Sequence, residues 1–273
     1  MPRSRVRGIS QKGVYILPSL FTSMGLFSGF YALIGAIQGR FELAGWAIIV
    51  AAIFDILDGR VARLLQAETA FGAEYDSLCD MLSFGIAPAV LMYLWALVHL
   101  PSELHKLAWL AAFGLAACAA LRLARFNVQV GKHDKRYFQG LPTPASALLV
   151  ATAVLFHEDV GIEPWPWLWF GVSLVLSWLM VSNVRFVSGK NVDLRQRQSV
   201  GIVVFMIIAI AFIMADPYRV PFMLVLTYCL HGPLISLWQS YRVTRYRLAR
   251  RKVAARKKRV RETRTENTGE EGR

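Results

Sequence analysis

The chain has 273 residues, 55% of them hydrophobic, and its 31 Lys and Arg outnumber 18 Asp and Glu to give a net charge of +13. A soluble domain of this length does not contain so many long apolar segments, so the composition excludes an ordinary soluble globular protein. The positive net charge makes nucleic acid a candidate partner. No recognition motif accompanies the charge, and we expect no nucleic-acid binding.

Apolar stretches recur along the whole chain, and each predicts a membrane helix. They cover residues 14–37, 43–54, 81–98, 107–121, 141–156, 165–184, 200–215 and 220–238. Several reach the roughly 18–20 residues that cross a bilayer core, and the shorter ones extend through polar residues that we assign to an internal cavity. We therefore predict an all-α integral membrane protein with about eight transmembrane helices within residues 14–238. The first stretch lacks a small-residue cleavage site, so we interpret it as a retained helix.

The distribution of Lys and Arg predicts the orientation. If the basic segment 1–13 is cytoplasmic, the outer connections hold only Arg40, Lys106 and Arg219, and the other basic residues fall on the inner side. Short cytoplasmic loops carry this excess, so both termini are predicted to be cytoplasmic. The basic and then polar tail, 239–273, is expected to be flexible and to contact anionic lipids, at about 1 kcal/mol per nearby basic residue.

Four acidic residues lie at the edges of these apolar segments. Asp55 and Asp58 are i,i+3 neighbours and Asp76 and Asp80 are i,i+4 neighbours, so on helices each pair projects from one face. An ionised side chain at bilayer depth is costly unless it is paired, hydrated or ligated. Two such faces brought together offer hard oxygen ligands, which suit Mg²⁺ or Mn²⁺. A purely structural alternative is ion pairing with nearby arginines at a helix end.

The acids belong to a longer pattern of eight specified positions: D-x-x-D-G-x-x-A-R, eight residues, then G-x-x-x-D-x-x-x-D. The positions are Asp55, Asp58, Gly59, Ala62, Arg63, Gly72, Asp76 and Asp80. This segment, 55–80, resembles the signature of the CDP-alcohol phosphatidyltransferases and matches it at every fixed position. The resemblance implies a helical bundle that transfers a phosphatidyl group from CDP-diacylglycerol to an alcohol and releases CMP.

The same resemblance implies roles for the four acids. Asp55, Asp58 and Asp76 are expected to be the main ligands of two divalent ions, with Asp80 at the edge of the metal site. Two ions can stabilise both the attacking and the leaving oxygen of a phosphoryl transfer. Within the family the last Asp of the motif is the proposed general base, so Asp80 is expected to accept the proton of the alcohol.

Five residues are candidates for binding CDP-diacylglycerol. Gly59 and Gly72 leave room for a ligand, although close helix packing is the alternative. Arg63 offers several donors to a phosphate, and Thr69 either donates to the same group or caps a helix. Relatives often have Pro-Asn near the start of the first helix, where this chain has a Pro-Ser pair ending at Ser19. Ser19 is thus a departure from the family pattern.

The acceptor is predicted from two further blocks, residues 121–127 and 138–145. Both resemble the corresponding parts of bacterial membrane-embedded phosphatidylserine synthases, and the resemblance extends over roughly residues 13–190. Free L-serine carries a carboxylate, which Arg122 or Arg125 can hold with two contacts, and Asn127 can add an amide contact. Ordinary anchoring of arginines at the cytoplasmic surface is the alternative.

Other functions remain open from the sequence. Glycerol 3-phosphate would use the same arginines, and inositol and choline are further acceptors for a sister enzyme. A metal- or proton-coupled transporter would also explain intramembrane acids, but it predicts acids along a whole pathway and two mirrored halves. A scaffold with a basic tail leaves the motif unexplained. We expect an enzyme of the bacterial inner membrane, a homodimer as in its relatives, with its active site facing the cytoplasm.

Overall fold

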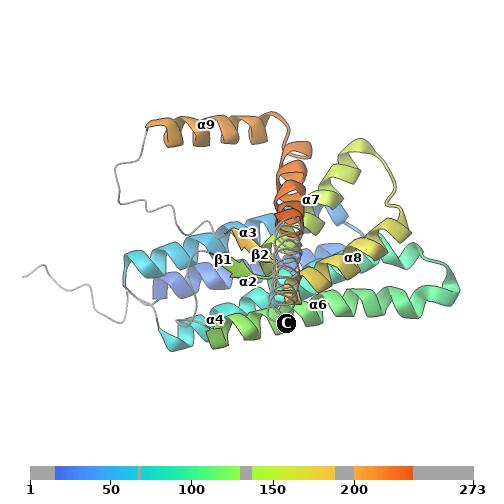
Figure 1. Ribbon diagram of the computed structural model, residues 1–273, viewed down its shortest axis with the longest axis horizontal. Coiled ribbons are helices and arrows are strands. Elements are labelled where there is room, and N and C mark those ends of the chain that lie inside the picture. Colours follow the sequence, from blue (N-terminus) through green and yellow to red (C-terminus); the bar gives the residue numbers. More distant parts are fainter. Residues whose placement is uncertain (1–15, 67–68, 130–136, 188–199, 236–273) are drawn as a thin grey trace, which may run out of the picture. The chain divides into compact units, whose positions relative to one another are not determined.

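A computed structural model describes residues 16–66, 69–129, 137–187 and 200–235. The predicted basic segment 1–13 and the tail 239–273 lie outside the described residues. The chain divides into two units, Met1–Cys229 and Leu230–Arg273, and the fold and the site both belong to the first. That unit is helical, with one short two-stranded ribbon, as Figure 1 shows.

Helices α2 (Ile16–Ile37) and α3 (Phe41–Leu64) form a hairpin. The turn between them contains Gly39 with φ +73°, a left-handed conformation that glycine adopts without steric cost. Ser28 fixes the register of the pair, because its hydroxyl donates to the Ala47 carbonyl oxygen at 2.8 Å. The acids Asp55 and Asp58 therefore lie in the second half of α3, beside the first half of α2.

The next stretch is helical throughout but changes its winding in the middle. Helix α4 (Ala70–Asp80) runs into a π-helical segment, η1 (Met81–Ile86), and then into α5 (Ala87–Trp95). The short 3₁₀ turns η2 (Leu97–His99) and η3 (Ser102–Leu104) lead to the long helix α6 (His105–Gln129). A π segment places one extra residue in a turn and is frequent at functional sites. Here it begins directly after Asp80.

Within residues 137–187 and 200–235, the described part of the second half, there are four more helices. They are α7 (Thr143–Val160), α8 (Pro166–Val181), α9 (Val200–Ala215) and a final helix, Arg219–Ile235. Thus each predicted apolar stretch lies in a helix or overlaps one. The stretch 165–184 is shorter as a helix than the sequence indicated, since α8 ends at Val181 and Ser182 is already extended.

The structure is all-helical as predicted, apart from one small antiparallel ribbon among the described residues that the sequence did not indicate. Strand β1 (Tyr137–Gln139) pairs with β2 (Arg185–Val187), which joins the connection before α7 to the connection after α8. Gly140, with φ +79°, continues the contact by donating its amide to the Val184 carbonyl oxygen at 2.8 Å. Three-residue strands that pair across the chain leave no periodic pattern in sequence, which explains the omission.

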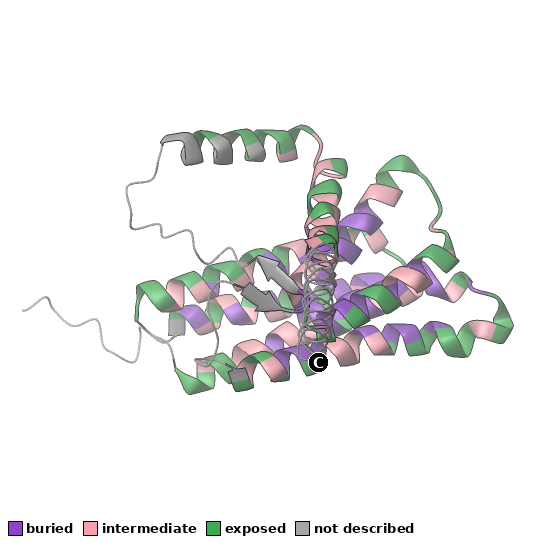
Figure 2. Ribbon diagram, viewed as in Figure 1, coloured by how far each residue is buried: buried purple, intermediate pink, exposed green. Residues whose placement is uncertain are grey.

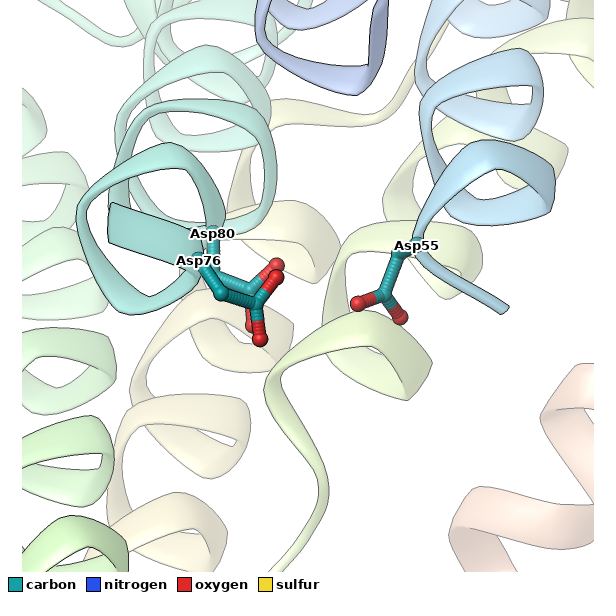
Figure 3. A group of neighbouring side chains, drawn as sticks. All are labelled: Asp55, Asp76 and Asp80. Atoms are coloured by element: carbon teal, nitrogen blue, oxygen red, sulfur yellow. The ribbon is translucent and has the colours of Figure 1, made fainter. Parts of the chain in front are cut away.

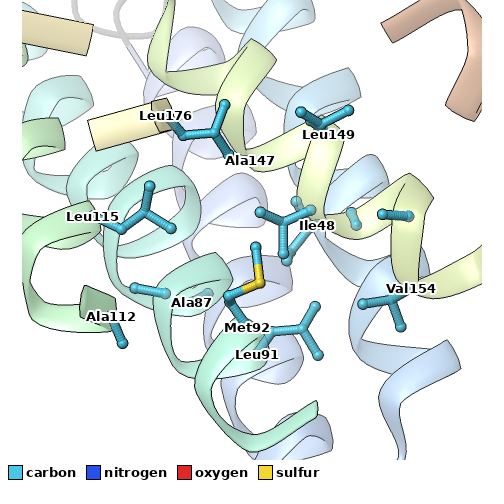
Figure 4. Packing of buried hydrophobic residues seen from close by; sticks show 14 of the residues in the cluster. Ile48, Ala87, Leu91, Met92, Ala112, Leu115, Ala147, Leu149, Val154 and Leu176 are labelled. Atoms are coloured by element: carbon cyan, nitrogen blue, oxygen red, sulfur yellow. The ribbon is translucent and has the colours of Figure 1, made fainter. Parts of the chain in front are cut away.

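The interior is packed with small and medium apolar side chains. Ile48 of α3 and Leu91 and Met92 of α5 are fully buried, and Figure 4 shows them together with Leu176 of α8. Many buried positions are alanines, which let helix backbones approach closely, as is common between membrane helices. Large apolar side chains such as Phe27 instead lie on the exposed faces that Figure 2 colours green.

Three helical stretches in the described part of the chain are long and apolar enough to cross a membrane: Leu17–Ile37, Ala70–His99 and Ser102–Val128. Two shorter apolar helices, Pro166–Val181 and Arg219–Ile235, accompany them. Their length, together with large apolar residues on the outer faces, is characteristic of a membrane protein. The count of eight spans and the orientation of the termini stay predictions.

Candidate active site

Three of the four signature acids, one on α3 and two on α4, come together in the structure. Asp55, Asp76 and Asp80 each offer a carboxylate oxygen, and these three oxygens all lie within 4.8 Å of one another. Figure 3 shows the Asp76 and Asp80 side chains of α4 pointing toward the side chain of Asp55 on α3. Each carboxylate is partly buried. The helical spacing read from the sequence therefore leads to one cluster of hard oxygen ligands, a donor set that suits Mg²⁺ or Mn²⁺.

The fourth acid, Asp58, lies beside this cluster and is not one of the three mutually close residues. It is buried, with 5% of its surface exposed, and it lines the same pocket as the other three acids. Thr22 and Gly25 of α2 complete the adjacent wall of this pocket. The sequence prediction of four metal ligands thus corresponds to a group of three, with Asp58 next to it.

The π segment holds the acid-bearing helix against α2. Ser83 in η1 is buried and donates its hydroxyl to the Gly25 carbonyl oxygen at 3.2 Å. A Cβ placed at Gly29, one turn further along α2, would lie 2.7 Å from the Ser83 Cα, so the two backbones are in direct contact. Asp80 is the last residue of α4, directly before this contact. Its position is therefore fixed by packing of η1 on α2.

Two of the predicted donor-binding residues interact with each other. The Arg63 side chain is exposed, and its Nε donates to the Gly59 carbonyl oxygen at 2.7 Å. Among the described residues, no other part of the protein comes within 4 Å of the position that a Cβ on Gly59 would occupy, so the space beside this glycine is open. The role of Gly59 in binding the donor stays a prediction.

Thr69 and Gly72 have a structural role in this conformation. Thr69 is the N-cap of α4, and its hydroxyl oxygen accepts a hydrogen bond from the Gly72 amide at 2.9 Å. A Cβ at Gly72 would lie 3.0 Å from that same oxygen, which is a close contact. The sequence left a helix cap open as the alternative for Thr69, and the cap is present.

A group of hydroxyls joins α2 to α4 near Ser19. The Ser23 hydroxyl donates to the Ser19 carbonyl oxygen at 2.8 Å and lies 2.9 Å from the Tyr75 hydroxyl. Sequence reasoning did not single out Ser23 or Tyr75. Their positions in the sequence could have identified them as candidates, because Ser23 follows Ser19 by one helical turn and Tyr75 directly precedes Asp76.

The three candidates for the serine pocket have different surroundings. Arg122 on α6 is buried, interacts electrostatically with Asp80, and donates from Nη1 to the Thr143 hydroxyl oxygen at 3.0 Å. Arg125 instead donates to the Asn183 side-chain oxygen at 2.6 Å and to the Val181 carbonyl oxygen at 3.2 Å.

Asn127 contacts α4 at Ser77 and not at an acid of the cluster. Its amide nitrogen donates to the Ser77 hydroxyl oxygen at 2.9 Å, and both residues line a second pocket between α4 and α6. Of the predicted serine-binding residues, Arg122 interacts electrostatically with Asp80, the general-base candidate.

Comparison with known proteins agrees with this geometry. The model of the CDP-alcohol phosphatidyltransferase family matches residues 15–182. The matched region contains the helices α2 to α8 and all the acids of the cluster, and it makes up more than half of the chain. The chain therefore belongs to the CDP-alcohol phosphatidyltransferase family, a family of enzymes of phospholipid biosynthesis.

Several similar proteins carry a more specific name. A protein of Helicobacter pylori strain J99, named CDP-diacylglycerol–serine O-phosphatidyltransferase, is 33% identical over 197 residues, 71% of this chain and 81% of that protein. One of Mycobacterium leprae with the same name is 32% identical over 237 residues, 84% of this chain and 77% of its own length. An archaetidylserine synthase of Methanothermobacter thermautotrophicus is 31% identical over 174 residues, 62% of this chain and 69% of that protein.

Proposed function

We propose that this chain transfers the phosphatidyl group of CDP-diacylglycerol to the hydroxyl of L-serine, forming phosphatidylserine and CMP. The observation that carries the proposal is the convergence of Asp55, Asp76 and Asp80 within 4.8 Å in a chain of this family. The names of the similar proteins support serine as the acceptor, since the two bacterial relatives are named as transferring to serine and the archaeal one is named as a synthase of archaetidylserine.

The acid cluster is suited to divalent cations. Asp55, Asp76 and Asp80 would hold Mg²⁺ or Mn²⁺, two ions in all, and Asp58 would serve as a further ligand from the wall of the same pocket. When bound, such ions neutralise the charge of the diphosphate and stabilise the leaving oxygen.

The reaction exchanges one P–O bond for another. The serine hydroxyl oxygen attacks the phosphorus that carries the diacylglycerol, the bond from this phosphorus to the oxygen of CMP breaks, and Asp80 accepts the hydroxyl proton. Asp80 is suited to this role because it belongs to the cluster and is the last residue of α4. It also interacts electrostatically with Arg122, the residue assigned to the serine carboxylate. A positioned general base contributes about 10²–10⁴-fold to such a step.

The two substrates have separate sets of residues. Gly59, with its open space, and Arg63, with its exposed guanidinium, would bind the diphosphate of the donor, and Ser19, Thr69 and Gly72 would shape the same site. Arg122 would hold the serine carboxylate. Arg125 and Asn127 would support this pocket by fixing α8 and α4 beside it.

The setting of the enzyme follows the same proposal. The chain would span the bacterial inner membrane with about eight helices, act as a homodimer, and open its acid cluster to the cytoplasm, where serine and CDP-linked substrates meet. Its basic tail would contact anionic lipids of the inner leaflet. The apolar helices Leu17–Ile37, Ala70–His99 and Ser102–Val128 support the membrane location.

The test is CMP release by the purified protein in detergent with CDP-diacylglycerol and Mn²⁺, supplying L-serine, glycerol 3-phosphate, inositol or choline singly. We expect release with serine, and its loss in Asp80→Asn. Glu74→Gln is the matched control, because Glu74 is an exposed acid on the same helix outside the cluster. Release with a different alcohol would assign a sister activity, and metal-independent release would contradict the mechanism.

A further inference from the structure

Arg122 is a buried cation with an unused donor. Only 9% of the residue is exposed, and burying a guanidinium is costly unless its N–H groups find acceptors. Nη1 has one acceptor, the hydroxyl of Thr143. Nε is fully buried and has no hydrogen-bond partner among the residues that the structure describes. A buried N–H group without a partner is rare, so this one is a candidate to receive an acceptor from a bound ligand.

The surroundings of Arg122 indicate what that acceptor is. Arg122 and Asp80 attract each other electrostatically, yet they form no ion pair within 4.0 Å in the described part of the chain. A small molecule with a hydroxyl near Asp80 and an anionic group near Arg122 would use both residues. A carboxylate satisfies a guanidinium better than a neutral hydroxyl, because the hydrogen bonds are charge-assisted.

Thr143 is placed to fix the direction of this guanidinium. It is 1% exposed and is the first residue of α7, between Pro142 and Pro144, both of which restrict the backbone. Its branched side chain has few rotamers. The Thr143 oxygen accepts from Nη1 at 3.0 Å, so this bond orients the guanidinium and leaves Nε without a partner among the described residues.

We propose that Thr143 is a positioning residue that holds Arg122 with its Nε–H toward the carboxylate of the acceptor, and so makes the enzyme select an alcohol that carries a carboxylate. This inference rests on the proposed function, because it presupposes transfer to an amino-acid hydroxyl. Thr143 itself does not contact the reacting atoms in this account. It acts through Arg122 alone.

The test compares two acceptors that differ in one charge, L-serine and L-serinamide, in the CMP-release assay at saturating CDP-diacylglycerol. Thr143→Val keeps the shape of the side chain and removes the acceptor oxygen, and Thr143→Ser keeps the oxygen. We expect Thr143→Val to raise the KM for serine about tenfold, as for loss of a hydrogen bond to a charged group. The KM for CDP-diacylglycerol should be unchanged, the preference for serine over serinamide should fall by a similar factor, and Thr143→Ser should stay near wild type.

Two controls keep the outcomes distinct. If Thr143→Val does not fold, Thr143→Ala also lacks the acceptor oxygen and takes its place, with the KM for CDP-diacylglycerol reporting on an intact donor site. An unchanged serine preference in these variants would overturn the inference, and so would a Thr143→Ser variant as poor as Thr143→Val. If the wild-type protein releases no CMP in response to serine, the proposed function itself fails.

Discussion

Gly29 on α2 and Ser83 in the π segment η1 touch at their backbones, since a Cβ on Gly29 would lie 2.7 Å from the Ser83 Cα. Real Cβ atoms do not come this close, so no larger residue fits without displacing η1. Ser83 follows Asp80 by three residues, and it also binds the Gly25 carbonyl oxygen. The contact between α2 and η1 therefore determines where a carboxylate of the candidate active site lies.

Gly29→Ala is accordingly expected to lower CMP release by about tenfold or more, because a shift near 1 Å at a catalytic group is that costly. The apparent melting temperature in detergent should also fall, as overpacking typically costs about 1–3 kcal/mol. Gly171→Ala on α8 is the matched control, because nothing lies within 4 Å of its Cβ position. Normal activity in Gly29→Ala would show that the close contact does not position Asp80.

Asp55→Asn is expected to raise the Mn²⁺ concentration needed for half-maximal CMP release by at least about tenfold, since it removes one of three converging carboxylates. The measurement is a metal titration after chelator treatment. Asp159→Asn serves as the comparison, because Asp159 is an acid at the end of α7 that pairs with Arg219 at 3.5 Å, outside the cluster. Equal metal dependence in both variants would contradict the assignment of Asp55 as a ligand.

Gly140→Ala should be more harmful than Gly161→Ala. Both glycines have positive φ, +79° and +69°, and an alanine in this region costs about 1–2 kcal/mol. A Cβ at Gly161 meets nothing within 4 Å, whereas one at Gly140 would lie 3.1 Å from the Ser182 carbonyl oxygen and still closer to that of Met180. We expect a larger fall in melting temperature for Gly140→Ala. Equal falls would mean that the contact of Gly140 with the end of α8 contributes nothing.

Arg125→Gln is expected to lower the melting temperature and to leave the KM for serine nearly unchanged. Arg125 donates to Asn183 and to the last carbonyl of α8, so its loss should cost about 1 kcal/mol of stability. Serine kinetics of Arg125→Gln and Arg122→Gln, measured side by side, check the assignment. A rise in serine KM in Arg125→Gln, with an unchanged melting temperature, would place Arg125 in the acceptor pocket itself.

Much of the helical framework and of the acid cluster was predictable because both depend on local regularities. Asp76 and Asp80 share one face of α4 simply because they are four residues apart on a helix. The apolar stretches predicted helices at the right places, although the end of α8 was wrong by a few residues. Thr69 was recognised as a possible cap from its residue type.

The remaining features depend on contacts between distant residues, which a single sequence does not contain. Arg125 reaches Asn183, 58 residues away, instead of a substrate pocket, and Asn127 contacts Ser77, 50 residues away. Strands β1 and β2 also pair with each other although they are far apart in the sequence. No local period marks any of these pairs.

The sequence by itself determined that this chain has apolar helices and two acid pairs on helix faces, because helical periodicity and hydrophobicity are properties of neighbouring residues. Only the tertiary structure decided that Asp55, Asp76 and Asp80 form the close group with Asp58 beside it, and that Arg122 donates to Thr143 whereas Arg125 donates to Asn183. The physical reason is packing: the approach of α2 to η1 and the hydrogen bond of Arg122 to Thr143 set these distances.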